Sequence, residues 1–259
     1  MSSVVFIMID GLRPEAIAEC PNLRGVMARG AHTLRATSVM PSITLPCHMS
    51  IFHSVPPTRH GITTNDWMPM ARPLPGLIEV AHAAQKECAF IYNWEQLRDL
   101  SRPGHLRHTR FKDCAYDVDG DVWIADEAVH LLTHARLDFA FIYFGTVDTL
   151  GHLAGWMSPE YLAQARAVDE QLGRVLAALP AESQVLIHSD HGGHDRTHGT
   201  DAPEDLTIPW VISGPRIRQQ HPIASPVSLL DTAPTLAHLL GLAPHPQWEG
   251  RVVEEIFEQ

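Results

Sequence analysis

Short runs of consecutive apolar residues recur along the chain. Val4–Ile9 is apolar at every position, and similar runs lie at Phe139–Phe144, 185–187 and 208–212, with a weaker one at 89–92. An unbroken apolar run of this length is typical of a strand whose two faces are both buried. The pattern therefore predicts a strand in each of these ranges.

Between these runs, the apolar positions follow a helical period. In 159–179 they recur every three or four residues and so share one face of a helix, and 121–135 and 228–240 show the same spacing. Strands that alternate with helices indicate an α/β fold. We expect a mostly parallel central sheet with helices on both faces.

The range 66–117 follows neither period over its whole length. It is rich in Pro, Trp and Met at first and becomes polar around 102–110. We expect part of it to belong to the sheet and part to form a small cap or insertion over one edge of the sheet. The chain has 259 residues and no internal repeat, which fits one domain with a sizeable core.

Composition narrows the class of protein. Apolar residues make up 45% and charged residues 19%, which is ordinary for a globular protein, and the net charge of -11 argues against stable binding to nucleic acid or to an anionic membrane. The first residues lack the pattern of a signal peptide, and no apolar run approaches the about 20 residues of a membrane span. The four cysteines are far apart, as expected for reduced thiols. We therefore expect a cytoplasmic protein without membrane partners.

Three of the predicted strands lead into an aspartate. Asp10 closes the first strand, Asp148 follows the run that ends at Phe144, and Asp190 follows the run at 185–187. In open α/β sheets the ligand site lies beyond the carboxyl ends of the strands. A single aspartate at a strand end is usually a turn former or a helix cap, but three of them predict a convergent site.

The chain has seventeen histidines, and several lie beside these aspartates. His152 is four residues after Asp148, His191 directly follows Asp190, and His198 lies a short loop further on. Carboxylate and imidazole together suit Zn²⁺ best, with Mn²⁺ or Fe²⁺ as alternatives. The cluster predicts a metal site. We interpret two neighbours, His188 and His194, as a strand residue and as a supporting or exposed residue.

The segment 41–48 offers a nucleophile. It reads Pro-Ser-Ile-Thr-Leu-Pro-Cys-His and precedes an apolar stretch. A hydroxyl needs a metal or a base to attack at neutral pH, and a helix N-terminus favours an anionic oxygen or phosphoryl group. The ordinary interpretation of Thr44 as a helix cap is compatible with catalysis. Thr44 is the preferred nucleophile, with Ser42 and Cys47 as weaker candidates.

With these motifs in order, the sequence resembles the alkaline phosphatase superfamily and, within it, the nucleotide pyrophosphatase/phosphodiesterase branch. The resemblance covers nearly the whole chain and is carried by short motifs at 9–11, 41–48, 60–65, 148–152, 189–192, 197–199 and 230–235. It implies one alkaline phosphatase-like catalytic domain over 1–259. It also implies hydrolysis of a small-molecule phosphodiester or nucleotide pyrophosphate through a phosphothreonine on Thr44.

The resemblance also implies roles for individual residues. Two divalent ions would be held, one by Asp148, His152 and His198, and the other by Asp10, Thr44, Asp190 and His191. Asn65 would help to stabilise a phosphoryl oxygen. The residue after the nucleophile is often an aromatic that stacks on a nucleotide base, and here it is Leu45. Tyr143 matches the second aromatic wall of that site.

Other functions of the same superfamily stay open at this point. A phosphomonoesterase tends to add a basic residue, and Arg13 and Arg59 lie near the motifs but are isolated. A phosphonate hydrolase could use the same metal ligands. A sulfatase is disfavoured because Cys47 is followed by His48 rather than by the pattern of that class. A more distant alternative is a metal-binding protein without catalytic activity.

Overall fold

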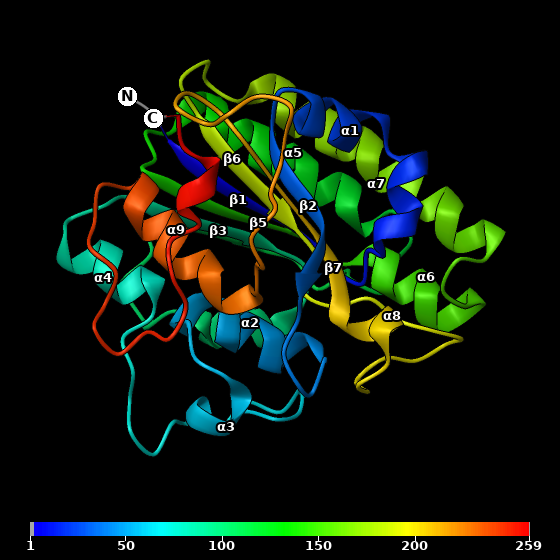
Figure 1. The fold of residues 1–259 in the computed structure, drawn as a ribbon, viewed down its shortest axis with the longest axis horizontal. Coiled ribbons are helices and arrows are strands. Elements are labelled where there is room, and N and C mark those ends of the chain that lie inside the picture. The colour runs from blue at the N-terminus through cyan, green and yellow to red at the C-terminus, as the bar shows by residue number, and fades with distance from the viewer. Residues whose placement is uncertain (1–2, 259) are drawn as a thin grey trace.

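A computed structural model describes residues 3–258 and contains one mixed sheet at its centre (Figure 1). In spatial order its strands are β4 (His108–Phe111), β3 (Cys88–Tyr92), β5 (Phe139–Phe144), β1 (Val4–Ile9), β6 (Gln184–His188), β7 (Thr207–Ser213), β2 (Gly30–Thr37) and β8 (His221–Pro222). Strand β7 runs antiparallel to both of its neighbours, and the other pairings are parallel. The expected α/β fold with a mostly parallel sheet is therefore confirmed.

The two faces of the sheet support separate hydrophobic cores. Along β1 successive side chains alternate, so that Phe6 packs into one core and Ile7 into the other. One face is covered by α1 (Pro21–Ala28), α5 (Gly120–His134) and α7 (Pro159–Ala178), and the opposite face by α2 (Thr44–His53), α4 (Leu77–Ala83) and α9 (Thr232–Leu239) (Figure 1). Burial on both faces explains why the central strands read as unbroken apolar runs.

Shorter elements complete the chain. Helix α6 (Thr146–Ala154) follows β5 directly and packs on α7, and α8 (Pro203–Leu206) leads into β7. The other helical segments among the described residues are α3 (Pro57–His60) and the short 3-10 helices η1 (Pro14–Glu19), η2 (Glu95–Leu100), η3 (Leu229–Asp231) and η4 (Glu254–Ile256).

The sequence pattern located the central elements better than the outer ones. All five predicted strands are present, but it missed β2, β4 and β8 at or near the sheet edges, where exposed positions interrupt the apolar pattern. The helix expected over 228–240 divides into η3 and α9, with the Ser228 hydroxyl accepting from Leu230 N. The range 66–117 contributes α4, β3, η2 and β4, so much of it belongs to the sheet and its cover.

The parallel centre of the sheet brings the predicted site residues to one end. Strands β1 and β6 lie side by side, and Asp10 and Asp190 follow their carboxyl ends. On the other side of β1, strand β5 leads into α6, which carries Asp148. Gly11 has φ of +67°, and a Cβ there would lie 3.0 Å from the Asp148 Cα. A glycine at this position therefore allows the end of β1 to approach α6 closely.

Candidate metal centre

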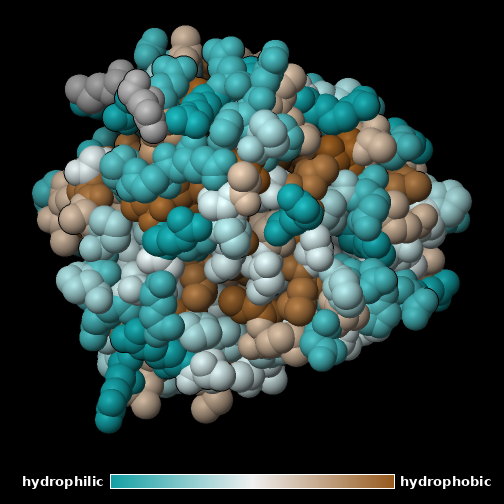
Figure 2. Space-filling model, viewed as in Figure 1, coloured by the Kyte–Doolittle hydropathy of each residue, from teal (hydrophilic) through white to brown (hydrophobic). Residues whose placement is uncertain are grey.

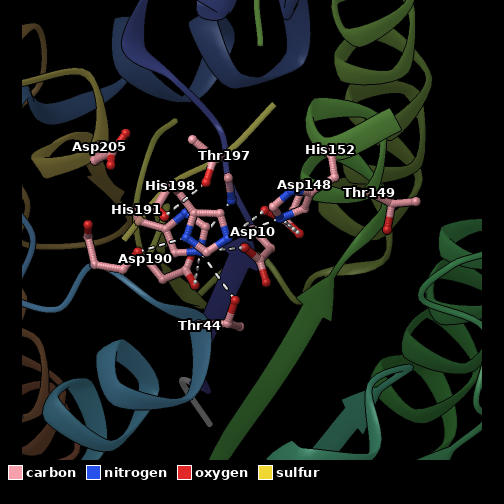
Figure 3. A network of polar contacts seen from close by, with 12 residues as sticks. Asp10, Thr44, Asp148, Thr149, His152, Asp190, His191, Thr197, His198 and Asp205 are labelled. Carbon is pink, nitrogen blue, oxygen red and sulfur yellow. Dashed lines mark hydrogen bonds and ion pairs between the residues drawn. The ribbon is translucent and has the colours of Figure 1, made fainter. Parts of the chain in front are cut away.

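Two groups of ligand-type side chains meet at the carboxyl end of the sheet (Figure 3). The first, which we call the inner group, contains Asp10, Asp190 and His191, and all three are buried. His191 Nε2 lies 3.3 Å from Asp10 Oδ1 and 3.4 Å from Asp190 Oδ2. The inner group thus joins residues from the ends of two neighbouring parallel strands around a single point.

The second, or outer, group contains Asp148, His152 and His198. Asp148 and His152 lie one turn apart on α6, with His152 Nε2 3.6 Å from Asp148 Oδ2. The loop that follows β6 supplies His198, whose Nε2 lies 3.7 Å from Asp148 Oδ1 and 3.1 Å from His152 Nε2. These are the two ligand sets that the family resemblance implied.

The three histidines share one arrangement that prepares them to bind a cation. In each, Nδ1 faces a backbone carbonyl: Gly192 O at 2.8 Å for His191, Arg196 O at 3.0 Å for His152 and Ser42 O at 2.8 Å for His198. A carbonyl only accepts, so Nδ1 carries the proton and Nε2 presents its lone pair to the group. Two such lone pairs 3.1 Å apart, as in the outer group, repel each other unless a cation lies between them.

The carboxylates of the two groups are also arranged to bind a cation. Asp10 Oδ1, Asp148 Oδ1 and Asp190 Oδ2 are buried and have no hydrogen-bond partner among the described residues. Buried polar atoms in proteins are otherwise almost always paired. Burial and the neighbouring carboxylates raise the pKa of Asp10, and burial raises the pKa of Asp148. Unpaired oxygens that face imidazole lone pairs fit divalent metal ions, so the donor set is a candidate metal centre.

Thr44 lies beside the inner group. It is the first residue of α2, and its Oγ1 is 3.2 Å from His191 Nε2 (Figure 3). The start of the helix directs the unpaired N–H groups of its first turn to the same side. Asn65 lies nearby, with Oδ1 accepting from Leu45 N at 3.0 Å. The structure therefore brings Thr44 and Asn65 to the edge of the metal centre.

The two residues expected to contact a substrate base are both buried. Leu45 is 0% exposed and belongs to the core under α2, and Tyr143 is 2% exposed. The Tyr143 hydroxyl donates to Asp10 Oδ2. Neither side chain offers a surface on which a base could stack, in contrast to the expected aromatic wall. Tyr143 instead orients a ligand of the inner group.

The weaker nucleophile candidates have other roles. The Ser42 hydroxyl is buried and donates to Thr200 O at 2.9 Å. Cys47 is also buried, and burial raises the pKa of its thiol well above the usual range. A thiol in that state is a poor nucleophile. Ser42 is thus engaged with the loop that carries His198, and the Cys47 thiol lies 3.3 Å from the Ser38 hydroxyl.

The remaining candidates near the motifs also have partners elsewhere. His188 Nε2 pairs with the Thr232 hydroxyl at 3.0 Å, and His194 Nδ1 lies 2.7 Å from Asp205 Oδ1. Arg13 forms an ion pair with Glu15 at 2.8 Å, and Arg59 forms one with Glu249 at 2.6 Å. These contacts agree with the interpretation of the four residues as structural or surface groups.

Trp156 is a supporting residue that the sequence did not indicate. Its indole N–H donates to Gly11 O at 2.9 Å, and its ring meets those of His152 and His198 edge-on. A Cβ at Gly193 would lie 2.3 Å from this ring. Trp156 therefore packs between the loop of His198 and the helix of His152. A hint is that it follows His152 by four residues, but a tryptophan at that spacing is common in any hydrophobic core.

The sheet order and the helices on both faces define the fold as alkaline phosphatase-like. A solved structure of human ectonucleotide pyrophosphatase/phosphodiesterase 5 covers all of both chains with a TM-score of 0.84 at 15% identity. A phosphonate monoester hydrolase from Silicibacter pomeroyi covers 97% of this chain and 76% of its own with a TM-score of 0.75 at 16% identity. These likenesses concern the fold.

The sequence comparison identifies the family. Residues 4–206 match the family model of type I phosphodiesterase/nucleotide pyrophosphatase, so the chain belongs to that family. Among curated relatives, 2,3-bisphosphoglycerate-independent phosphoglycerate mutase of Cellvibrio japonicus is 28% identical over 150 residues. That match spans 54% of this chain but 28% of the mutase. No helix within residues 3–258 is long and apolar enough to cross a membrane.

Proposed function

We propose that the chain hydrolyses phosphodiesters or nucleotide pyrophosphates with two divalent metal ions, Zn²⁺ by preference, and a phosphothreonine intermediate on Thr44. The observation that carries the proposal is the position of Thr44 Oγ1, 3.2 Å from His191 Nε2 and at the start of α2. A hydroxyl beside a group of unpaired carboxylate oxygens and imidazole lone pairs is placed for activation by a cation. A murine relative of the same fold was solved in complex with AMP, which supports a phosphoester substrate.

The two ligand groups would hold one ion each. The inner group with the Thr44 oxygen would hold one, and the outer group the other. When bound, the ions would lower the pKa of the Thr44 hydroxyl and stabilise charge on the phosphoryl and leaving oxygens. The three aspartates of the centre would otherwise repel an anionic substrate, so the cations are also needed for binding.

The residues of the chain then account for the remaining steps. The Thr44 hydroxyl loses its proton to water, Oγ1 forms a bond to phosphorus, and the bond to the leaving oxygen breaks with its electron pair, so that the leaving oxygen takes up a proton. Asn65 accepts from Leu45 with Oδ1, which leaves its amide N–H groups to donate to an equatorial phosphoryl oxygen, together with the Thr44 N–H. Water then attacks the phosphothreonine and restores the Thr44 hydroxyl.

The substrate class rests on family membership and on the side chains around the centre. Arg13 and Arg59 are engaged with Glu15 and Glu249, so neither supplies the added positive charge expected of a monoesterase. The burial of Leu45 and Tyr143 removes both expected contacts to a nucleotide base. We therefore favour a diester over a monoester and do not restrict the diester to nucleotides. Phosphonate or monoester hydrolysis is the alternative, with phosphonate favoured by the structural likeness to a phosphonate monoester hydrolase.

The metal-loaded protein can be tested with bis-p-nitrophenyl phosphate, p-nitrophenyl phosphate and p-nitrophenyl phenylphosphonate. We expect the highest kcat/KM with the diester. A higher value with the monoester or the phosphonate would replace the diesterase assignment by that activity. Absence of turnover with all three, in a protein that binds two metal equivalents, would instead favour the non-catalytic alternative.

A further inference from the structure

Asp121 is a buried carboxylate that belongs to neither ligand group. It lies in the first turn of α5 and is 2% exposed. Its Oδ1 accepts from Asn93 Nδ2 at 2.8 Å and Gly145 N at 3.1 Å, and its Oδ2 accepts from Thr146 N at 3.1 Å and Thr146 Oγ1 at 2.6 Å. Four donors around one carboxylate are far more than a turn requires.

These donors identify what Asp121 holds in place. Gly145 and Thr146 are the N-cap and the first residue of α6, the helix that carries Asp148 and His152. Asp121 satisfies two of the N–H groups that a helix start leaves unpaired and places negative charge at its positive end. Through α6, Asp121 therefore supports Asp148 and His152, two of the three members of the outer group.

A second contact ties α6 to the segment that precedes Asp121. The Thr149 hydroxyl donates to Ala115 O at 2.8 Å. Thr149 follows Asp148 on α6, and its side chain points away from the histidines of the centre (Figure 3). Ala115 N donates in turn to Asn93 O at 3.1 Å. A Cβ at Gly120 would lie 1.9 Å from Cys114 O, so α5 begins directly against this segment. The residues around Asp121 thus hold α6 on both sides of Asp148.

The inner group also has hydrogen bonds and strand pairings of its own. Asp190 Oδ1 accepts from Gly11 N at 3.3 Å, and Asp10 Oδ2 accepts from Tyr143. Both aspartates also follow strands paired along their length in the centre of the sheet. A change at Asp121 would therefore act most directly on the outer group and reach the inner group indirectly, through the packing of Gly145 against Tyr143.

We propose that Asp121 is a positioning residue that sets the affinity of the outer group for its cation and affects the inner group much less. The inference rests on the proposed two-ion function. It assigns to Asp121 a role through α6 rather than contact with metal or substrate.

The test is Asp121→Asn, which replaces one accepting oxygen by an NH₂ group that faces other donors. Titration calorimetry of the metal-free protein with Zn²⁺, and the visible spectrum on addition of Co²⁺, report each equivalent separately. We expect wild type to bind two equivalents. The variant should bind one equivalent with little change in affinity and the other about 10-fold to 100-fold more weakly, the scale known for supporting residues of metal sites.

Asp169→Asn is the matched control. Asp169 is also 2% exposed and caps a helix start, with Asn22 N at 2.8 Å and Leu23 N at 2.9 Å donating to it at the beginning of α1. This control should lose stability against denaturant but bind both equivalents as wild type does. If Asp121→Asn does not fold, Thr146→Val removes one of the four donors and should weaken the same equivalent to a smaller extent.

Different outcomes overturn different claims. Fewer than two equivalents in wild type would overturn the two-ion proposal and, with it, the role of Asp121. Two equivalents in wild type with both retained in Asp121→Asn, or both weakened equally, would overturn the role of Asp121 alone. The same loss of metal affinity in Asp169→Asn would show that general destabilisation, rather than positioning of α6, weakens metal binding.

Discussion

The inner and outer ligand groups use the same residue types but are built on different supports. The inner group follows β1 and β6, two paired strands with both faces buried, and its His191 side chain is 0% exposed. The outer group lies on the short helix α6 and a loop, and its His152 side chain is 44% exposed. The inner group is therefore held by the sheet. The outer group is held by side-chain contacts of a short helix and a loop at the exposed edge of the centre.

This difference suggests a division of labour. The inner group adjoins Thr44, the proposed nucleophile, where a fixed geometry would favour its activation, because preorganised groups need no rearrangement in the transition state. The half-exposed outer group is accessible to a substrate and a leaving group of varied size. On the face shown in Figure 2, hydrophobic side chains gather in several areas that polar side chains separate.

Removal of the metal should have the largest effect and gives the most direct test of the comparison. A strong chelator should abolish turnover, because three unpaired aspartates then face the substrate. We expect the two ions to be released in two phases, with the exposed outer group losing its ion first. Inductively coupled plasma analysis of samples taken during chelation measures both phases. Full activity after both ions are lost would contradict the metal scheme, and simultaneous loss would contradict the difference between the groups.

Thr44→Ala should have the next largest effect. Without the nucleophile, turnover should fall by about 1,000-fold or more, since losses of this scale or larger follow removal of a catalytic hydroxyl. Mass spectrometry after acid quench should find the phosphorylated chain in wild type but not in the variant. Ser42→Ala is the control and should still form the phosphoenzyme. Near-normal turnover in Thr44→Ala would rule out the covalent route.

A pair of histidine variants compares the two groups directly. His191→Ala should reduce kcat by about 100-fold or more, because it removes a ligand beside the nucleophile, a site where a cation contributes several kcal/mol. His152→Ala should reduce it less, by about 10-fold to 100-fold, with loss of affinity for one equivalent. Steady-state kinetics at saturating Zn²⁺ measures both. A larger loss in His152→Ala would reverse the proposed division of labour.

The smallest effect is expected for Tyr143→Phe. This change removes the hydroxyl that donates to Asp10 and leaves a buried carboxylate oxygen without its partner. The inner equivalent should bind about ten-fold more weakly, while the outer one is unchanged. Calorimetry with Zn²⁺ detects the change, and Tyr92→Phe, a buried tyrosine on the neighbouring strand β3, serves as control. If Tyr143→Phe weakens the binding of nucleotide substrates but not of other substrates, Tyr143 contacts a base after all.

The sequence alone allowed the central fold and the residues of the candidate metal centre to be predicted. Unbroken apolar runs identify strands buried on both faces, and the carboxyl ends of parallel strands meet at one edge. Aspartates placed after such runs, such as Asp10 and Asp190, therefore had to lie close together. The interrupted patterns of β2 and β4 carried no comparable signal, because one-sided or exposed positions mix polar and apolar residues.

Other features depended on the tertiary structure. Tyr143 lies on the face of β5 that α2 covers, and only the packing of α2 shows that its hydroxyl is directed to Asp10. The contact of Asp121 with Gly145 and Thr146 joins residues 24 and 25 positions apart, through the arrangement of α5 beside α6. Local patterns determine which residues can form strands and bind metal. The orientation of each side chain is decided by which helix covers it, and that follows from packing across the whole molecule.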